Sequence, residues 1–179
     1  MISVLSKIGA ALDAIAVVFR AAIALLLLAM LTINMVNIVF RSFLGGAFDW
    51  VFHWTILMFV WMVCLGFYVY MRGNRDVVVD LIASRMPAPI RRLLAIAADI
   101  IGIVFMYMVL SPAMTLIGMQ TGGMESISLP IYVGSLPLFM SAACLTVHFA
   151  LHGLLVAMGE IDPFVATEPH DILDAGQPR

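Results

Sequence analysis

Long stretches without a charged side chain constrain this sequence more than any other feature. A membrane-spanning helix needs about 20 apolar residues, and four stretches meet that length. They cover residues 21–40, 50–71, 100–124 with a backward extension over 93–98, and 126–159. Apolar residues make up 64% of the chain, against about 45–50% in soluble domains. We therefore expect an all-α integral membrane protein with four transmembrane helices.

The remaining composition excludes other classes of protein. The net charge is only −2 and no run of Lys or Arg occurs, so nothing indicates nucleic-acid binding. Cys64 and Cys144 lie far apart within apolar stretches. They are therefore interpreted as small hydrophobic residues and not as a disulfide or a metal pair.

The distribution of basic residues predicts the orientation in the membrane, because cytoplasmic connections carry an excess of Lys and Arg. With the first residues in the cytoplasm and the first span uncleaved, the outside holds only Arg41. The inside holds Lys7, Arg20, Arg72, Arg75, Arg85, Arg91, Arg92 and Arg179. Both termini are thus expected in the cytoplasm. Residues 1–159 form the membrane domain, and the acidic residues 160–179 are expected to be a disordered cytoplasmic tail.

The connection between the second and third spans contains a candidate interfacial helix. Its apolar residues recur at helical spacing, and Asp76 and Asp80 lie one turn apart. Pro87 ends it, and Pro89 suits the first turn of the third span. A plain basic loop is the alternative. We expect an interfacial or structural role for six charged residues: Arg72, Arg75, Asp80, Arg91, Arg92 and Asp99.

Four aromatic residues share one face of the second span. Trp50, Trp54, Trp61 and Tyr68 follow each other at intervals of four, seven and seven residues. Trp61 lies about 16 Å deeper than Trp50 at helical rise, so anchoring at the membrane surface does not explain it. We expect Trp61 to pack against another helix, either within this chain or in a partner subunit.

Polar residues inside the first and third spans indicate helix association. Asn34, Asn37 and Arg41 form a stripe on the first span, and amides in a membrane favour hydrogen bonds between helices. Asp99 lies just inside the third span, where an ion pair with Arg20, Arg72 or Arg75 is favoured over a proton relay.

Histidines inside the spans raise the question of a haem or metal site. A haem with two histidine ligands needs imidazoles at similar depth on facing helices, whereas His53 and the pair His148 and His152 fall near opposite surfaces. His148 and His152 lie one turn apart, but no third ligand is near them. No cofactor and no enzymatic activity are expected. Pro137, near the start of the fourth span, is a candidate kink.

The second span and the connection after it resemble a known family. Similarity to the small, four-helix DctQ-like subunit of tripartite ATP-independent periplasmic (TRAP) transporters extends over residues 8–159. It rests on Trp54, Trp61, Leu65–Gly66, Arg72–Gly73, Val79–Asp80–Leu81, Pro87, Arg91–Arg92, Leu129–Pro130 and Leu136–Pro137. That family often has acidic residues just after the tryptophan that opens the second span, where this chain has Val51, Phe52 and His53.

The resemblance implies a bacterial inner-membrane system for sodium-driven uptake of organic acids. In such a system a large permease subunit holds the solute and a periplasmic binding protein delivers it. This chain has no inverted repeat or broken helix of a self-sufficient transporter, so we expect a scaffold for the large subunit. The residues expected to pack against that subunit are Asn34, Asn37, Trp54, Trp61 and Tyr68. Those expected to dock the binding protein are Arg41, Asp49, His53 and Glu125.

Two other classes of function remain open from the residues alone. A membrane anchor for a respiratory enzyme would need matched histidines or a quinone pocket. A small proton-coupled exporter would need a carboxylate in the middle of a span, for which Asp99 is the candidate.

Overall fold

Four long apolar helices dominate the protein, each long enough to cross a membrane. The computed structural model describes residues 2–46, 48–73, 87–120, 122–124 and 127–160. The long helices are α1 (Ile2–Leu44), α2 (Asp49–Arg72), α4 (Ala88–Leu110) and α6 (Tyr132–Met158). The predicted all-α fold with four spans is confirmed. The predicted interfacial helix and the tail 161–179 lie outside the described residues.

Helix α1 is much longer than the predicted span 21–40. Its 43 residues extend about 64 Å at a rise of about 1.5 Å per residue, roughly twice the hydrocarbon thickness of a bilayer. The charged residues of its first half do not end the helix, because one apolar face continues past them. Leu12, Ala16 and Phe19 are buried on that face, at the spacing of successive helical turns.

Helix α2 begins and ends at the charged residues that bound the predicted second span. Asp49 lies in its first turn and Arg72 in its last. Each charge is on the end of the helix that the helix dipole favours.

The third span is interrupted after residue 110, unlike the predicted continuous stretch to residue 124. Pro112, which has no amide hydrogen to donate, separates α4 from the short helix α5 (Ala113–Met119). Pro89 occupies the first turn of α4, as predicted.

A short antiparallel hairpin precedes the fourth span and takes up the first residues of the predicted stretch 126–159. Strands β1 (Gly123–Met124) and β2 (Ile127–Pro130) pair Gly123 with Pro130 and Met124 with Ile127. Helix α6 therefore begins at Tyr132 and not at residue 126. It ends at Met158 and is capped by Gly159, whose φ of 77° gives the left-handed conformation that glycine adopts most readily.

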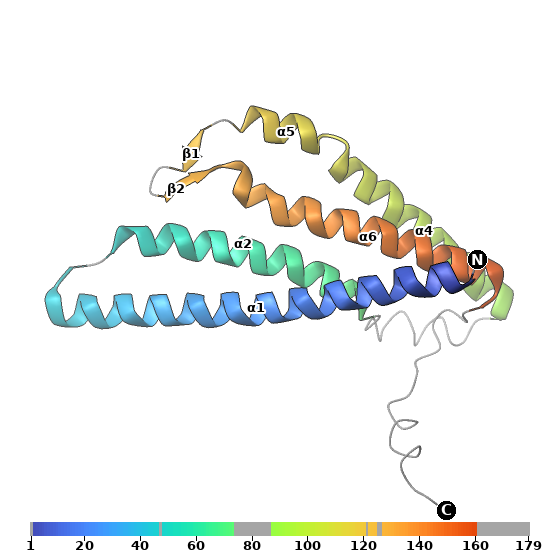
Figure 1. Ribbon diagram of the computed structural model, residues 1–179, viewed down its shortest axis with the longest axis horizontal. Helices are drawn as coiled ribbons and strands as arrows, with labels where there is room; N and C mark the ends of the chain where they lie inside the picture. Colours follow the sequence, from blue (N-terminus) through green and yellow to red (C-terminus); the bar gives the residue numbers. More distant parts are fainter. Residues whose placement is uncertain (1, 47, 74–86, 121, 125–126, 161–179) are drawn as a thin grey trace, which may run out of the picture.

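The long helices pack in the order α1, α2, α6, α4, since α2 contacts α1 and α6, and α6 contacts α4 (Figure 1). Arg72 lies at the end of the molecule where α1 and α4 begin, and we call it the Arg72 end. The opposite end, where α1 and α2 are joined, is the Arg41 end. The core lies between α1, α2, α4 and α6, and is made of Leu12, Ala16, Phe19, Leu65, Tyr68, Met106, Ala142, Leu145 and Leu151.

Candidate functional site

Arg72 connects three helices at its end of the molecule. From the last turn of α2, its Nε donates to Asp13 Oδ1 at 2.9 Å and its Nη2 donates to the Gly9 carbonyl oxygen at 3.1 Å, both on α1. Its Nη1 lies 2.9 Å from His148 Nδ1 on α6. A guanidinium has no acceptor, so Nη1 donates to an unprotonated Nδ1. The geometry therefore assigns His148 the neutral form with its proton on Nε2.

Among the described residues, Asp99 pairs with a histidine, where the sequence favoured an arginine. His152 Nδ1 on α6 lies 2.8 Å from Asp99 Oδ2 on α4, and the carboxylate is buried. A Cβ added at Gly153 would lie 3.2 Å from Asp99 Oδ2, so the glycine lets the carboxylate lie against the α6 backbone. The predicted partner Arg72 is instead held by Asp13 and His148, and Arg75 lies outside the described residues.

Tyr68 is a core residue of this chain, which corrects its assignment to partner packing. Its side chain is fully buried, with an exposed fraction of 0%. The hydroxyl donates to the Leu12 carbonyl oxygen at 2.9 Å, and the ring meets Phe19 edge to face with centroids 5.4 Å apart. No surface of Tyr68 is left for another subunit.

Trp61 and Pro137 both affect the hydrogen bonding of one backbone carbonyl, that of Val133. In α6, the Val133 carbonyl would accept a hydrogen bond from the amide of residue 137, four positions on. Proline at that position has no amide hydrogen. The indole Nε1 of Trp61 donates to the Val133 carbonyl oxygen at 3.1 Å instead. Trp61 therefore packs within this chain, the first of the two predicted options.

The two span asparagines also bond within the chain, and their packing against a partner subunit stays a prediction. Asn34 Nδ2 donates to Thr55 Oγ1 on α2 at 2.9 Å. Asn37 Oδ1 accepts from the backbone amide of Phe48, at the start of α2, at 3.0 Å. Both bonds fix α1 against α2. Of the residues predicted to contact the partner, Trp54 is half-buried and has no such internal bond among the described contacts.

The candidate docking residues gather at the Arg41 end. Arg41 is exposed in the last turn of α1, while Asp49 and His53 lie in the first two turns of α2. Aromatic rings lie among them: Phe40 stacks on Phe48 with centroids 4.3 Å apart. The fourth candidate, Glu125, lies outside the described residues.

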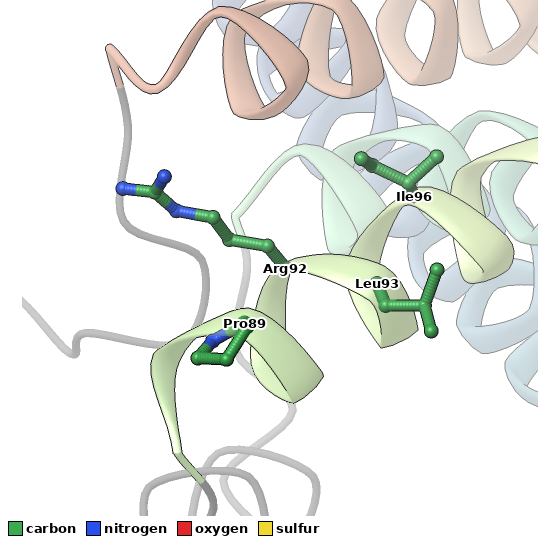
Figure 2. Close-up of a pocket in the computed structure, with 4 residues that line it drawn as sticks. All are labelled: Pro89, Arg92, Leu93 and Ile96. Atoms are coloured by element: carbon green, nitrogen blue, oxygen red, sulfur yellow. The ribbon is translucent and has the colours of Figure 1, made fainter.

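The basic start of α4 borders a groove of about 490 Å³. Figure 2 shows its lining residues, Pro89, Arg92, Leu93 and Ile96, and the Arg92 side chain extending toward the end of α6. The Arg92 guanidinium approaches within 3.7 Å of a Cβ placed at Gly159. Arg91 is half-buried beside it. Arg75 and Asp80, the other predicted charges of this region, lie outside the described residues.

Side chains that could bind a metal do not cluster in the part of the chain that the structure describes. Those residues include no group of three or more His, Cys, Asp or Glu side chains that could hold a metal ion. Cys64 and Cys144 are free thiols. His53 near the start of α2 and His148 near the end of α6 lie at opposite ends of the molecule (Figure 1).

Sequence reasoning missed the partners of these polar groups. Asp13 was not singled out, and His152 was considered for a metal and not for Asp99. The Pro137 position carried a usable signal, because a proline within a helix leaves the carbonyl four residues earlier without its donor. Trp61, which lies too deep to anchor at the membrane surface, was an available donor for that carbonyl.

The fold and these contacts define a multi-pass membrane protein in which several polar side chains of the described helices bond to neighbouring helices. Residues 30–158 match the family of tripartite ATP-independent periplasmic transporters, DctQ component, and the chain belongs to that family. The match covers most of the chain and ends with the last residue of α6. It identifies a non-enzymatic transporter component. None of the curated proteins or solved structures is significantly similar to the chain.

Proposed function

We propose that this chain is the fixed membrane partner of a large TRAP permease subunit, in a sodium-driven system for uptake of organic acids. The observation that carries this proposal is the internal use of its polar groups. Arg72, Asp99, Asn34 and Asn37 each bond to another helix or to the start of one. These bonds favour a rigid unit over a transporter that must offer polar groups to a solute and then release it.

The experiment is uptake into proteoliposomes driven by a sodium gradient. The assay contains the cognate binding protein and a panel of radiolabelled mono- and dicarboxylates. We expect uptake when this chain and the large subunit are reconstituted together, and background uptake with this chain alone. Gradient-dependent uptake by the chain alone would overturn the scaffold role and support the exporter alternative.

One face of α2 carries a continuous stripe of exposed residues. This stripe supports that face of α2 as the contact with the large subunit. The stripe repeats every three or four residues and comprises Phe52, Ile56, Phe59, Val63, Phe67 and Tyr70, each at least 42% exposed. Aromatic residues are enriched in protein interfaces. This stripe lies on the face of α2 opposite Trp54, and we propose it in place of Tyr68, the buried member of the residues that the sequence assigned to the interface.

The stripe is tested by truncating one of its aromatic residues. Phe59→Ala should lower recovery of the large subunit with a tagged chain. The matched control is Leu28→Ala on α1, whose side chain is also largely exposed, at 63%. Equal recovery for both variants would place the interface elsewhere.

The Arg41 end is proposed to dock the periplasmic binding protein through Arg41, Asp49, His53 and Glu125. Exposed charges mainly affect the rate and orientation of encounter. Arg41→Glu should therefore raise the half-saturating concentration of binding protein, leave the maximal uptake rate unchanged and weaken the salt dependence. Arg20→Glu, an exposed residue in the first half of α1, is the control. A loss of uptake that only follows the amount of complex in the membrane would show that Arg41 is a membrane anchor.

We further propose that both termini lie in the cytoplasm and the protein in the bacterial inner membrane, as this docking role requires. A version without Cys64 and Cys144 allows the orientation to be tested with single cysteines. Reagents confined to the outside should label a cysteine at Gly45 or Gly123. Labelling at Gly73 instead would reverse the orientation.

A further inference from the structure

The four long helices form two pairs, each held by its own polar contacts. In the first pair, Arg72 and Tyr68 of α2 bond to Asp13 and Leu12 of α1. In the second, His152 of α6 pairs with Asp99 of α4. A Cβ at Gly102 of α4 would lie 2.9 Å from the Phe149 ring of α6, so these two helices approach closely.

Hydrogen bonds at two levels join one pair to the other. Trp61 donates to Val133 toward the Arg41 end, and Arg72 donates to His148 at the Arg72 end. The first bond contains no group that titrates near neutral pH. The second depends on a histidine, whose charge ordinarily changes between about pH 5 and pH 8.

We propose that His148 is an acid-sensitive latch between the two helix pairs. Its neutral imidazole accepts the Arg72 hydrogen bond and holds α2 on α6. A proton added to Nδ1 removes that acceptor and places a second cation 2.9 Å from the guanidinium. Arg72 keeps its bonds to Asp13 and Gly9, so it stays with α1. The α1–α2 pair then moves away from α6 as a unit at the Arg72 end, while the Trp61–Val133 hydrogen bond still joins α2 to α6 toward the Arg41 end.

The other charged groups around His148 do not replace this contact. On its own helix, the His152 ring lies 6.2 Å away, and its Nδ1 bonds to Asp99 of α4. On α1, the Asp13 carboxylate is paired with Arg72 at 2.9 Å. On α2, the Tyr68 hydroxyl bonds to the Leu12 carbonyl oxygen. Both carboxylates that would attract a proton to His148 are thus already paired, while the guanidinium contacts the imidazole directly.

The direction of the pH effect follows from the proton balance. The native contact excludes a proton from Nδ1 that a free imidazole binds at mildly acidic pH. When the unfolded state binds more protons than the native state, stability falls as the pH falls. This inference goes beyond the proposed function, because it depends on the contacts of this chain and not on its partners or its orientation.

The test measures the separation of the two pairs in the full chain in lipid nanodiscs, without Cys64 and Cys144. Spin labels at Phe67 of α2 and Leu154 of α6, both partly exposed, report the distance between the pairs. We expect this distance to increase from pH 8 to pH 5. Labels at Val17 of α1 and Phe67 report the distance within the first pair, which should not change.

His148→Asn provides the matched variant, because an amide oxygen can accept the Arg72 bond but does not titrate in this range. It should abolish the pH-dependent separation, whereas His53→Asn at the opposite end should leave it unchanged. An unchanged Phe67–Leu154 distance in the wild type, or an equal pH response in His148→Asn, would overturn the proposal.

A second measurement uses wild-type protein, so it does not depend on whether a His148 variant folds. In wild-type protein with ¹⁵N-labelled histidine, the nitrogen spectrum at neutral pH distinguishes protonated from unprotonated ring nitrogens. We expect one buried histidine with an unprotonated Nδ1 that loses this signal on acidification. The absence of such a signal at neutral pH would also overturn the latch.

Discussion

Arg72 shows how one side chain can fix the end of a helix to two neighbours. Its three donors reach Asp13, Gly9 and His148 at distances between 2.9 and 3.1 Å. A lysine has a single ammonium and cannot copy the spread of a planar guanidinium. Arg72→Lys should therefore destabilise the fold by about 1–3 kcal/mol, the cost of leaving a buried polar partner unsatisfied.

Unfolding by SDS in mixed micelles measures this loss. Arg41→Lys is the control, since Arg41 is exposed at the opposite end and surface substitutions usually change stability by less than about 0.5 kcal/mol. Equal stability of the two variants would mean that the Arg72 contacts contribute nothing beyond those of an exposed charge.

Gly102 lies where α4 and α6 approach closely. A Cβ there would lie 2.9 Å from two Phe149 ring atoms. Gly102→Ala should cost about 1–3 kcal/mol, as overpacking of a filled interior does, and Phe149→Leu should relieve part of that cost. Gly118→Ala in α5 meets nothing within 4 Å and should be neutral or stabilising, because alanine favours helix. SDS unfolding again compares the variants, and an equal response at both glycines would contradict the close contact.

At the scale of elements, α2 and α6 are linked through a carbonyl that Pro137 leaves without its usual donor. Trp61→Phe removes the indole donor and should cost about 1–3 kcal/mol. In a Pro137→Ala background the Val133 carbonyl regains an amide donor within α6, so Trp61→Phe should cost less. A double-mutant cycle isolates this coupling, because the change in ring size is common to both backgrounds. Additive effects would show that the hydrogen bond contributes nothing to stability.

The elements differ in how far the sequence predicts them. The bounds of α2 follow from Asp49 and Arg72, because the cost of placing charge in lipid marks both ends. The full length of α1 does not follow from charge, since Asp13 is neutralised by a residue 59 positions away. Likewise, the pairing of Asp99 with His152 depends on which helix lies beside α4. Local spacing does not specify that arrangement.

At the scale of the whole molecule, two helix pairs carry broad apolar surfaces, while polar contacts hold each pair together and join one pair to the other. Leu25, Leu28 and Met35 of α1 are each more than 60% exposed, which suits lipid or another membrane subunit. The family match to the DctQ component agrees with a chain built to work beside a partner.

Co-expression of the tagged chain with the large permease subunit of its own TRAP system tests the central claim most directly. After mild detergent extraction, native mass spectrometry determines which subunits are recovered together. We expect a defined complex of the two subunits that is retained through purification. Recovery of the tagged chain free of the large subunit, with both proteins present in the membrane, would contradict its role as a fixed membrane partner.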